Sequence, residues 1–173
     1  MDMYYGKRTL ILSCAGSILA GVLLHFVYDW IPNAVTALIA PVNESLWEHT
    51  KLIYWPYLAA ALLLNRGRPG GKRPWLLILP LLCAGMLALG YGYHVLLRGE
   101  ELAVDIAIYV LLMAVGFWLP TRFSGPFEGV IWMLPVVLTA ILGGLIGIFT
   151  LWPPENILFT ELSAVRTWLT IPI

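Results

Sequence analysis

Seven side chains of the kinds that bind metals or move protons stand near the ends of apolar stretches in this sequence. Neutral imidazole and carboxylate groups are the ligands that Zn²⁺ and other divalent transition metals take in proteins. A metal held in this way polarises a carbonyl or phosphoryl oxygen and lowers the pKa of its bound water to about 7. The candidate residues are His25, Asp29, Glu44, Glu48, His49, His94 and Asp105.

A shared metal site gives each of these residues a role. Seven candidates exceed the four ligands of one zinc ion, so either some of them orient the imidazoles or two ions bind. Glu44 or Glu48 is the expected general base, and either would replace His49 as a ligand if that imidazole points away. The expected ligands of the divalent metal, with Zn²⁺ as the expected ion, are His25, His49, His94, Asp29 and Asp105.

The same residues also have ordinary structural explanations. Ser45 followed three residues later by Glu48 fits a capping box at the start of a helix. Glu44 could stabilise the same helix through its dipole, and His25 could be a hydrogen-bonded core residue. Capping does not explain three histidines in three separate segments, and this favours a shared site.

Composition places the chain in a membrane. The sequence is 60% hydrophobic and 12% charged, whereas soluble domains are about 45–50% apolar and about 25% charged. Disorder requires low hydrophobicity and is excluded. The formal net charge is zero, so nothing favours nucleic-acid binding, and the expected surroundings are a lipid bilayer.

Five apolar stretches predict an all-α integral membrane helical bundle of about five transmembrane helices, forming one domain over residues 1–173. A span needs about 20 residues to cross about 30 Å of hydrocarbon. The apolar part of the second stretch, 52–64, reaches only about 20 Å, so its helix is expected to begin near Glu44. A short interfacial or re-entrant segment is expected at 34–40. The expected spans are residues 9–29, 44–64, 75–97, 102–119 and 129–152.

Basic residues predict the orientation of the bundle. Cytoplasmic segments of membrane proteins carry an excess of Lys and Arg. Seven of the ten basic residues fall on one side of a five-span chain, which predicts a cytoplasmic N-terminus and an external C-terminus. The candidate site residues then lie in one layer near the outer surface. The seven are Lys7, Arg8, Arg66, Arg68, Lys72, Arg73 and Arg122.

The last span contains the pair Gly143 and Gly147, four residues apart. This spacing of small residues lets helices approach closely. We favour packing within the chain, and a homo-oligomer through these glycines is the alternative.

Three motifs carry a resemblance to a known family. They are His25-Phe26-x-Tyr28, the string Pro41-Val42-Asn43-Glu44-Ser45-x-Trp47-Glu48-His49-x-Lys51, and Pro153-Pro154, which opens a tail expected to cover the site. With them the chain resembles a family of small uncharacterised bacterial multi-pass membrane proteins. The resemblance implies a five-span architecture in the bacterial cytoplasmic membrane and brings no activity.

Three functions are compatible with these features. The first is a divalent-metal-dependent intramembrane hydrolase that opens to the outer leaflet and acts on a lipid or lipid-linked molecule. The second is a transporter or ion-pathway component, because ionisable groups in spans also mark ion paths. The apolar inner halves of the spans and the absence of an inverted repeat count against it. The third is a non-catalytic membrane accessory protein.

Overall fold

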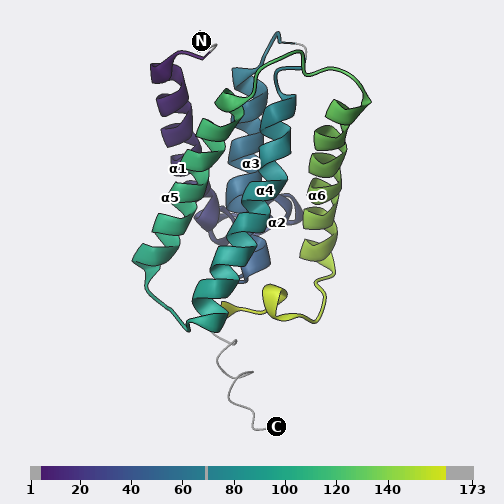
Figure 1. Ribbon diagram of the computed structural model, residues 1–173. Helices are drawn as coiled ribbons and strands as arrows, with labels where there is room; N and C mark the ends of the chain where they lie inside the picture. The colour runs from purple at the N-terminus through teal and green to yellow at the C-terminus, as the bar shows by residue number, and fades with distance from the viewer. Residues whose placement is uncertain (1–4, 69, 163–173) are drawn as a thin grey trace.

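The computed structural model describes residues 5–68 and 70–162, which form an all-α membrane helical bundle (Figure 1). Four of its helices are long and apolar enough to cross a membrane, and their exposed Leu, Ile and Val side chains form a surface suited to lipid. The expected fold class is confirmed. The four are α1 (Lys7–Trp30), α4 (Arg73–Gly90) with its extension η1 (Tyr91–Leu96), α5 (Leu102–Trp118) with η2 (Leu119–Arg122), and α6 (Leu134–Leu151) preceded by η3 (Val130–Met133).

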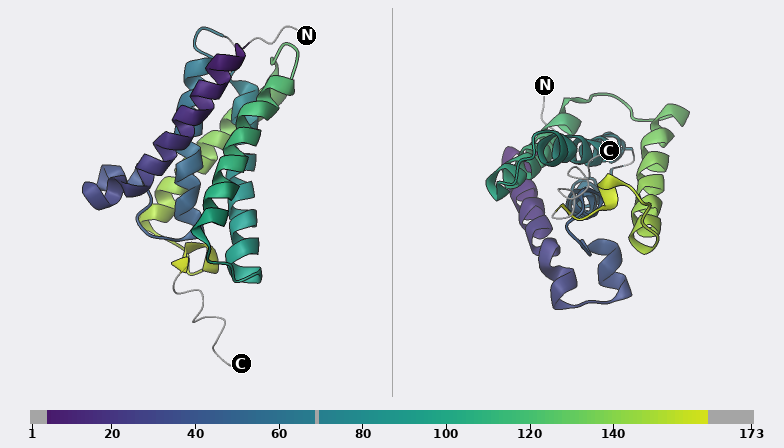
Figure 2. Two further views of the ribbon diagram at one scale, coloured as in Figure 1. Left: turned by 90° about the vertical axis from the view of Figure 1, so that its left-hand side faces the viewer. Right: turned by 90° about the horizontal axis from the view of Figure 1, so that it is seen from below.

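The helix α3 (Leu46–Leu64) lies in the middle of the bundle, ringed by the other helices (Figure 2, right). Twelve of its 19 residues are buried, against two of the 24 residues of α1. Its first turns carry Glu48, His49 and Lys51, so it is not one of the four strongly apolar helices. Its neighbours shield these polar residues from lipid, which makes charge tolerable inside a membrane protein.

The start of α3 differs from the expected start at Glu44. Ser45 is the N-cap, and its hydroxyl accepts a hydrogen bond from the Glu48 amide at 3.4 Å. Glu44 therefore lies in the loop that precedes the helix and is not part of α3. The Glu48 carboxylate does not complete a capping box either, because it accepts from the Val42 amide and from Lys51.

A six-residue helix, α2 (Ala34–Ile39), occupies the short apolar segment between α1 and α3. Asn33 caps it, since its side-chain oxygen accepts from the amides of Val35 and Thr36 at 2.8 and 3.1 Å. The backbone turns extended at Ala40, directly before Pro41. Figure 2 shows α2 lying between the ends of α1 and α6, beside the start of α3.

Tyrosine hydroxyls of the core join the helices. Tyr54 of α3 donates to the Thr139 carbonyl of α6 at 3.0 Å, and Tyr57 donates to the Gly116 carbonyl of α5 at 2.8 Å. Inside a membrane such a bond contributes about 0.6 kcal/mol on average. A Cβ atom at Gly143 would overlap the Tyr54 hydroxyl, so this glycine packs against α3 of its own chain.

A close approach of α1 to α3 and α5 at Gly21 predicts a measurable effect on stability. A Cβ atom at Gly21 of α1 would lie 2.7 Å from the Leu52 carbonyl oxygen of α3 and would overlap the Tyr109 hydroxyl. We expect Gly21→Ala to lower the free energy of unfolding by about 1–3 kcal/mol, the usual cost of overpacking. The matched control is Gly16→Ala on the same helix, where a Cβ atom meets nothing within 4 Å. Equal stability of the two variants in a detergent unfolding titration would contradict this packing.

Candidate functional site

The side chains expected to do chemistry gather at one end of the bundle, here called the site end. It comprises the last turns of α1, the loop 40–45, the first turns of α3, the π-helical η1 and the start of α5 (Figure 1). All three histidines lie there, as the topology predicted. The opposite end carries the N-terminus of α1 and the turn between α3 and α4.

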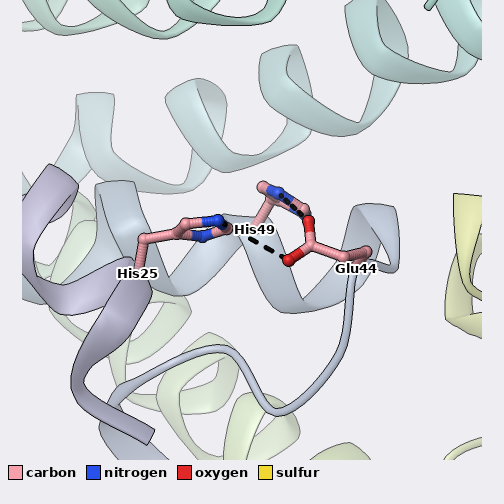
Figure 3. A group of neighbouring side chains, drawn as sticks. All are labelled: His25, Glu44 and His49. Carbon is pink, nitrogen blue, oxygen red and sulfur yellow. Dashed lines mark ion pairs between the residues drawn. The ribbon is translucent and has the colours of Figure 1, made fainter. Parts of the chain in front are cut away.

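Three of the candidates form a compact cluster, the His25–Glu44–His49 trio (Figure 3). One carboxylate oxygen of Glu44 lies 3.5 Å from His25 Nε2, and the other lies 3.4 Å from His49 Nε2. One ligand atom from each residue falls within 4.8 Å of the other two. Among the described residues no other three His, Cys, Asp or Glu side chains come so close.

The backbone at the start of α3 orients His49. Its Nδ1 lies 2.8 Å from the carbonyl oxygen of Ser45, the N-cap residue. A carbonyl only accepts hydrogen bonds, so Nδ1 carries a proton, and Nε2 is the ring nitrogen that faces Glu44. Histidines that bind metals usually donate their second ring N–H in this way.

Packing orients the second imidazole. The His25 ring lies edge-on to Phe26, with the ring centroids 5.1 Å apart, and 5.5 Å from the His49 ring. Its Nδ1 is buried and has no hydrogen-bond partner in the described part of the chain. Its Nε2 is the atom that faces Glu44.

The C-terminal segment helps to hold Glu44. The Glu44 carbonyl accepts a hydrogen bond from the Leu162 amide at 3.3 Å, and Ser45 forms an isolated antiparallel bridge with Glu161. The Glu44 side chain is 61% exposed. The neighbouring His49 imidazole holds the pKa of the Glu44 carboxyl below its ordinary value, so the group is an anion at neutral pH.

The third histidine belongs to a separate pair. His94 Nε2 lies 2.8 Å from Asp105 Oδ1, and His94 Nδ1 lies 3.0 Å from the Gly99 carbonyl oxygen. Because both ring nitrogens are engaged, His94 has no lone pair to give to a metal shared with the trio. Asp105 nevertheless lies close enough to His49 to act on it electrostatically.

Asp29 joins neither group. It is exposed on the last turn of α1 and makes no hydrogen bond or ion pair with any described residue. Of the five ligands expected from the sequence, the structure therefore brings His25 and His49 together, with Glu44 as the third member in place of His94, Asp105 or Asp29.

Glu48 forms a buried ion pair that the sequence analysis missed. Its Oε2 lies 2.5 Å from Lys51 Nζ, and the two side chains are 4% and 0% exposed. The ammonium also donates to the carbonyls of Ala37 and Ala40 at 2.7 and 3.2 Å. Lys51 is one of the three basic residues outside the seven that predict the orientation, but its spacing of three from Glu48 is the usual signal of a pair on a helix.

This ion pair supports the loop 40–45. Glu48 Oε2 accepts from the Val42 amide at 2.8 Å, and its Oε1 accepts from the Thr150 hydroxyl of α6 at 3.3 Å. Both carboxylate oxygens are thus engaged away from the trio. Glu44, two residues beyond Val42, is held beside the imidazoles by the same loop.

Comparison of the chain with known proteins identifies its family. Over residues 3–166 the chain matches a family of unknown function (DUF6512), and it belongs to that family. No curated protein and no solved structure was found to match it. The expectation of an uncharacterised family is confirmed over most of the chain, whereas the motifs quoted for the resemblance and the bacterial source stay predictions. Any function must be argued from the site itself.

Proposed function

We propose that this DUF6512 protein binds one divalent transition metal, with Zn²⁺ favoured, through His25, Glu44 and His49, and that it uses the metal for hydrolysis. Two imidazoles and one glutamate form a set that catalytic zinc sites employ, leaving a fourth position for water or substrate. The trio comes from α1, a loop and α3, so folding of the bundle would pre-form the site.

The spacing of the donor atoms is the observation that carries this proposal. The two N···O distances are 3.5 and 3.4 Å, longer than the usual hydrogen-bond range of about 2.7–3.2 Å. Zinc bonds of about 2.0–2.1 Å in a tetrahedral arrangement separate neighbouring ligand atoms by about 3.3–3.5 Å. These two distances run to different oxygens of Glu44, and one ligand atom from each residue lies within 4.8 Å of the others, so a small closing movement of the side chains would let the trio share one ion.

The expected chemistry follows from the donor set and the location. When bound, the metal would polarise a carbonyl or phosphoryl oxygen and supply an activated water. The chain would hold the metal with the trio, fix the His49 tautomer through Ser45, and place Asp105 near enough to influence charge at His49. At the end of a membrane bundle, a lipid or lipid-linked molecule is the favoured substrate.

Metal analysis of protein purified in detergent without a histidine tag tests the binding step. We expect about one zinc per chain in the wild type and an affinity about tenfold or more weaker in Glu44→Gln, because the carboxylate is a ligand. The matched control is Glu155→Gln, an exposed glutamate after α6 that lies outside the trio. A wild type that neither contains zinc nor is stabilised by added zinc would favour the accessory alternative.

Hydrolysis is tested separately with fluorescent lipid esters and amides presented in the same detergent. We expect turnover that a chelator abolishes and that added zinc restores. Turnover that survives both chelation and Glu44→Gln would not arise from the trio. A protein that binds zinc but moves ions across a vesicle membrane would support the transport alternative instead.

A further inference from the structure

Two cavities at the end of the bundle opposite the trio meet at one side chain. The first, of about 540 Å³, is a groove between α1 and α3. The second, of about 490 Å³, lies at the turn that joins α3 to α4. Arg68 lines both cavities, and its guanidinium lies 4.8 Å from the centroid of the Tyr5 ring. The two cavities therefore adjoin at Arg68, and their linings differ in chemistry.

The first cavity runs deep along the bundle. On α1 its lining extends from Gly6 to Ala20, and a rise of 1.5 Å per residue makes this length about 21 Å. One leaflet contributes about 15 Å of hydrocarbon, half of the usual 30 Å, so the groove is longer than one leaflet is thick. The α1 wall carries the hydroxyls of Thr9, Ser13 and Ser17 among small residues, whereas the α3 wall is apolar and consists of Pro56, Ala59, Ala60, Leu63 and Leu64.

The second cavity is strongly cationic. Four basic residues line it, and no acidic residue is among the described residues that line either cavity. The Arg73 guanidinium is fixed by donation to the Phe127 carbonyl, whereas Arg66 and Lys72 are exposed at the mouth. An anionic group at this mouth would therefore meet positive charge from the exposed Arg66 and Lys72.

We propose that this joined cavity binds an anionic phospholipid. The phosphate lies at the cationic mouth, and one acyl chain occupies the groove between α1 and α3. The combination decides the class of ligand, because a soluble anion would leave the apolar α3 wall of the groove uncovered and a zwitterionic lipid would match the cationic mouth poorly. Juxtamembrane basic residues strengthen binding of anionic lipid by about fivefold each.

Native mass spectrometry of the full chain, titrated with phosphatidylglycerol or phosphatidylcholine of identical acyl chains, tests the mouth. We expect phosphatidylglycerol to bind at least about tenfold more tightly. The double variant Arg66→Gln/Lys72→Gln should lose at least about tenfold of that affinity, at about fivefold per cation. The control Arg98→Gln removes an exposed arginine at the site end and should bind like the wild type.

A second variant tests the groove without changing charge. Gly16 lines the groove and a Cβ atom there meets nothing within 4 Å, so Gly16→Leu places a side chain where the acyl chain would lie. We expect Gly16→Leu to weaken the binding of phosphatidylglycerol by about tenfold. A loss of this size is comparable to losing a well-packed apolar contact between the acyl chain and the groove. The matched control is Ala15→Leu, an exposed neighbour that does not line the groove.

Three results would overturn the proposal. They are equal binding of the two lipids by the wild type, binding of free glycerol 3-phosphate as tight as that of phosphatidylglycerol, and a Gly16→Leu variant that binds phosphatidylglycerol as the wild type does. The second result would identify a soluble phosphate site, and the third would identify headgroup attraction alone.

Discussion

Lys51→Met will produce the largest loss of stability of any single substitution considered for this protein. Lys51 is 0% exposed, and its ammonium contacts Glu48 and two backbone carbonyls. Removing one partner of a buried ion pair leaves an uncompensated charge and costs about 3–5 kcal/mol. An unfolding titration in mixed detergent micelles measures the change.

The physical reason is charge rather than packing, and a double variant separates the two. Methionine fills much of the lysine volume, so the loss should come from the stranded Glu48 carboxylate. Glu48→Gln/Lys51→Met removes both charges, and we expect it to recover a large part of the lost stability, since replacing both members of a buried pair is often tolerated. The two single changes should therefore be strongly non-additive.

The control for this experiment is Lys7→Met, which removes an exposed lysine at the start of α1. It should change stability by less than about 0.5 kcal/mol, as surface substitutions usually do. A loss below about 1 kcal/mol for Lys51→Met, or additive effects of the two charge removals, would mean that the pair does not support the loop 40–45.

The second large effect concerns metal affinity. We expect His49→Ala to weaken zinc binding by about 100-fold or more, because even residues that only orient a ligand contribute about 10–100-fold. The zinc affinity of His94→Ala should stay within about threefold of that of the wild type. This change is smaller than the loss of about 10–100-fold expected for a residue that orients a ligand. The two histidines lie at the same end of the bundle, but His94 has both nitrogens engaged by Asp105 and Gly99.

This comparison uses residues of one type, so it controls for the loss of an imidazole as such. Affinity is measured by competition with a chromogenic zinc chelator, and the melting temperature of each variant checks that the bundle is intact. A loss of affinity in His94→Ala as large as that in His49→Ala would return His94 to the ligand set. Unchanged affinity in His49→Ala would remove the trio as a metal site.

Much of the architecture could be predicted from the sequence, because a membrane helix is a local property. Each helix satisfies its own backbone hydrogen bonds, and apolar runs of about 20 residues mark where it lies. For the same reason the depth of a residue follows from its position along its helix. The sequence therefore placed all three histidines at one end of the bundle, and they lie there in the structure.

The residue at which α3 begins did not follow from the length of its apolar run. Length arithmetic placed Glu44 inside the helix because a free-standing span must cross the whole hydrocarbon core. In the bundle α3 is surrounded by other helices and follows a folded loop, so it begins at Leu46 with Ser45 as the cap. This small shift frees Glu44 from the helix, and a loop residue can reach both His25 and His49.

Which polar residues become partners was decided only by the tertiary structure. By itself the sequence determined the all-α membrane fold and the end of the bundle at which the histidines lie, and it indicated a His and carboxylate site. The pairing of Glu48 with Lys51, of His94 with Asp105, and of Glu44 with two imidazoles depends on how each helix is rotated about its axis. Rotation follows from packing between segments distant in the chain, which the spacing of residues within one helix does not record.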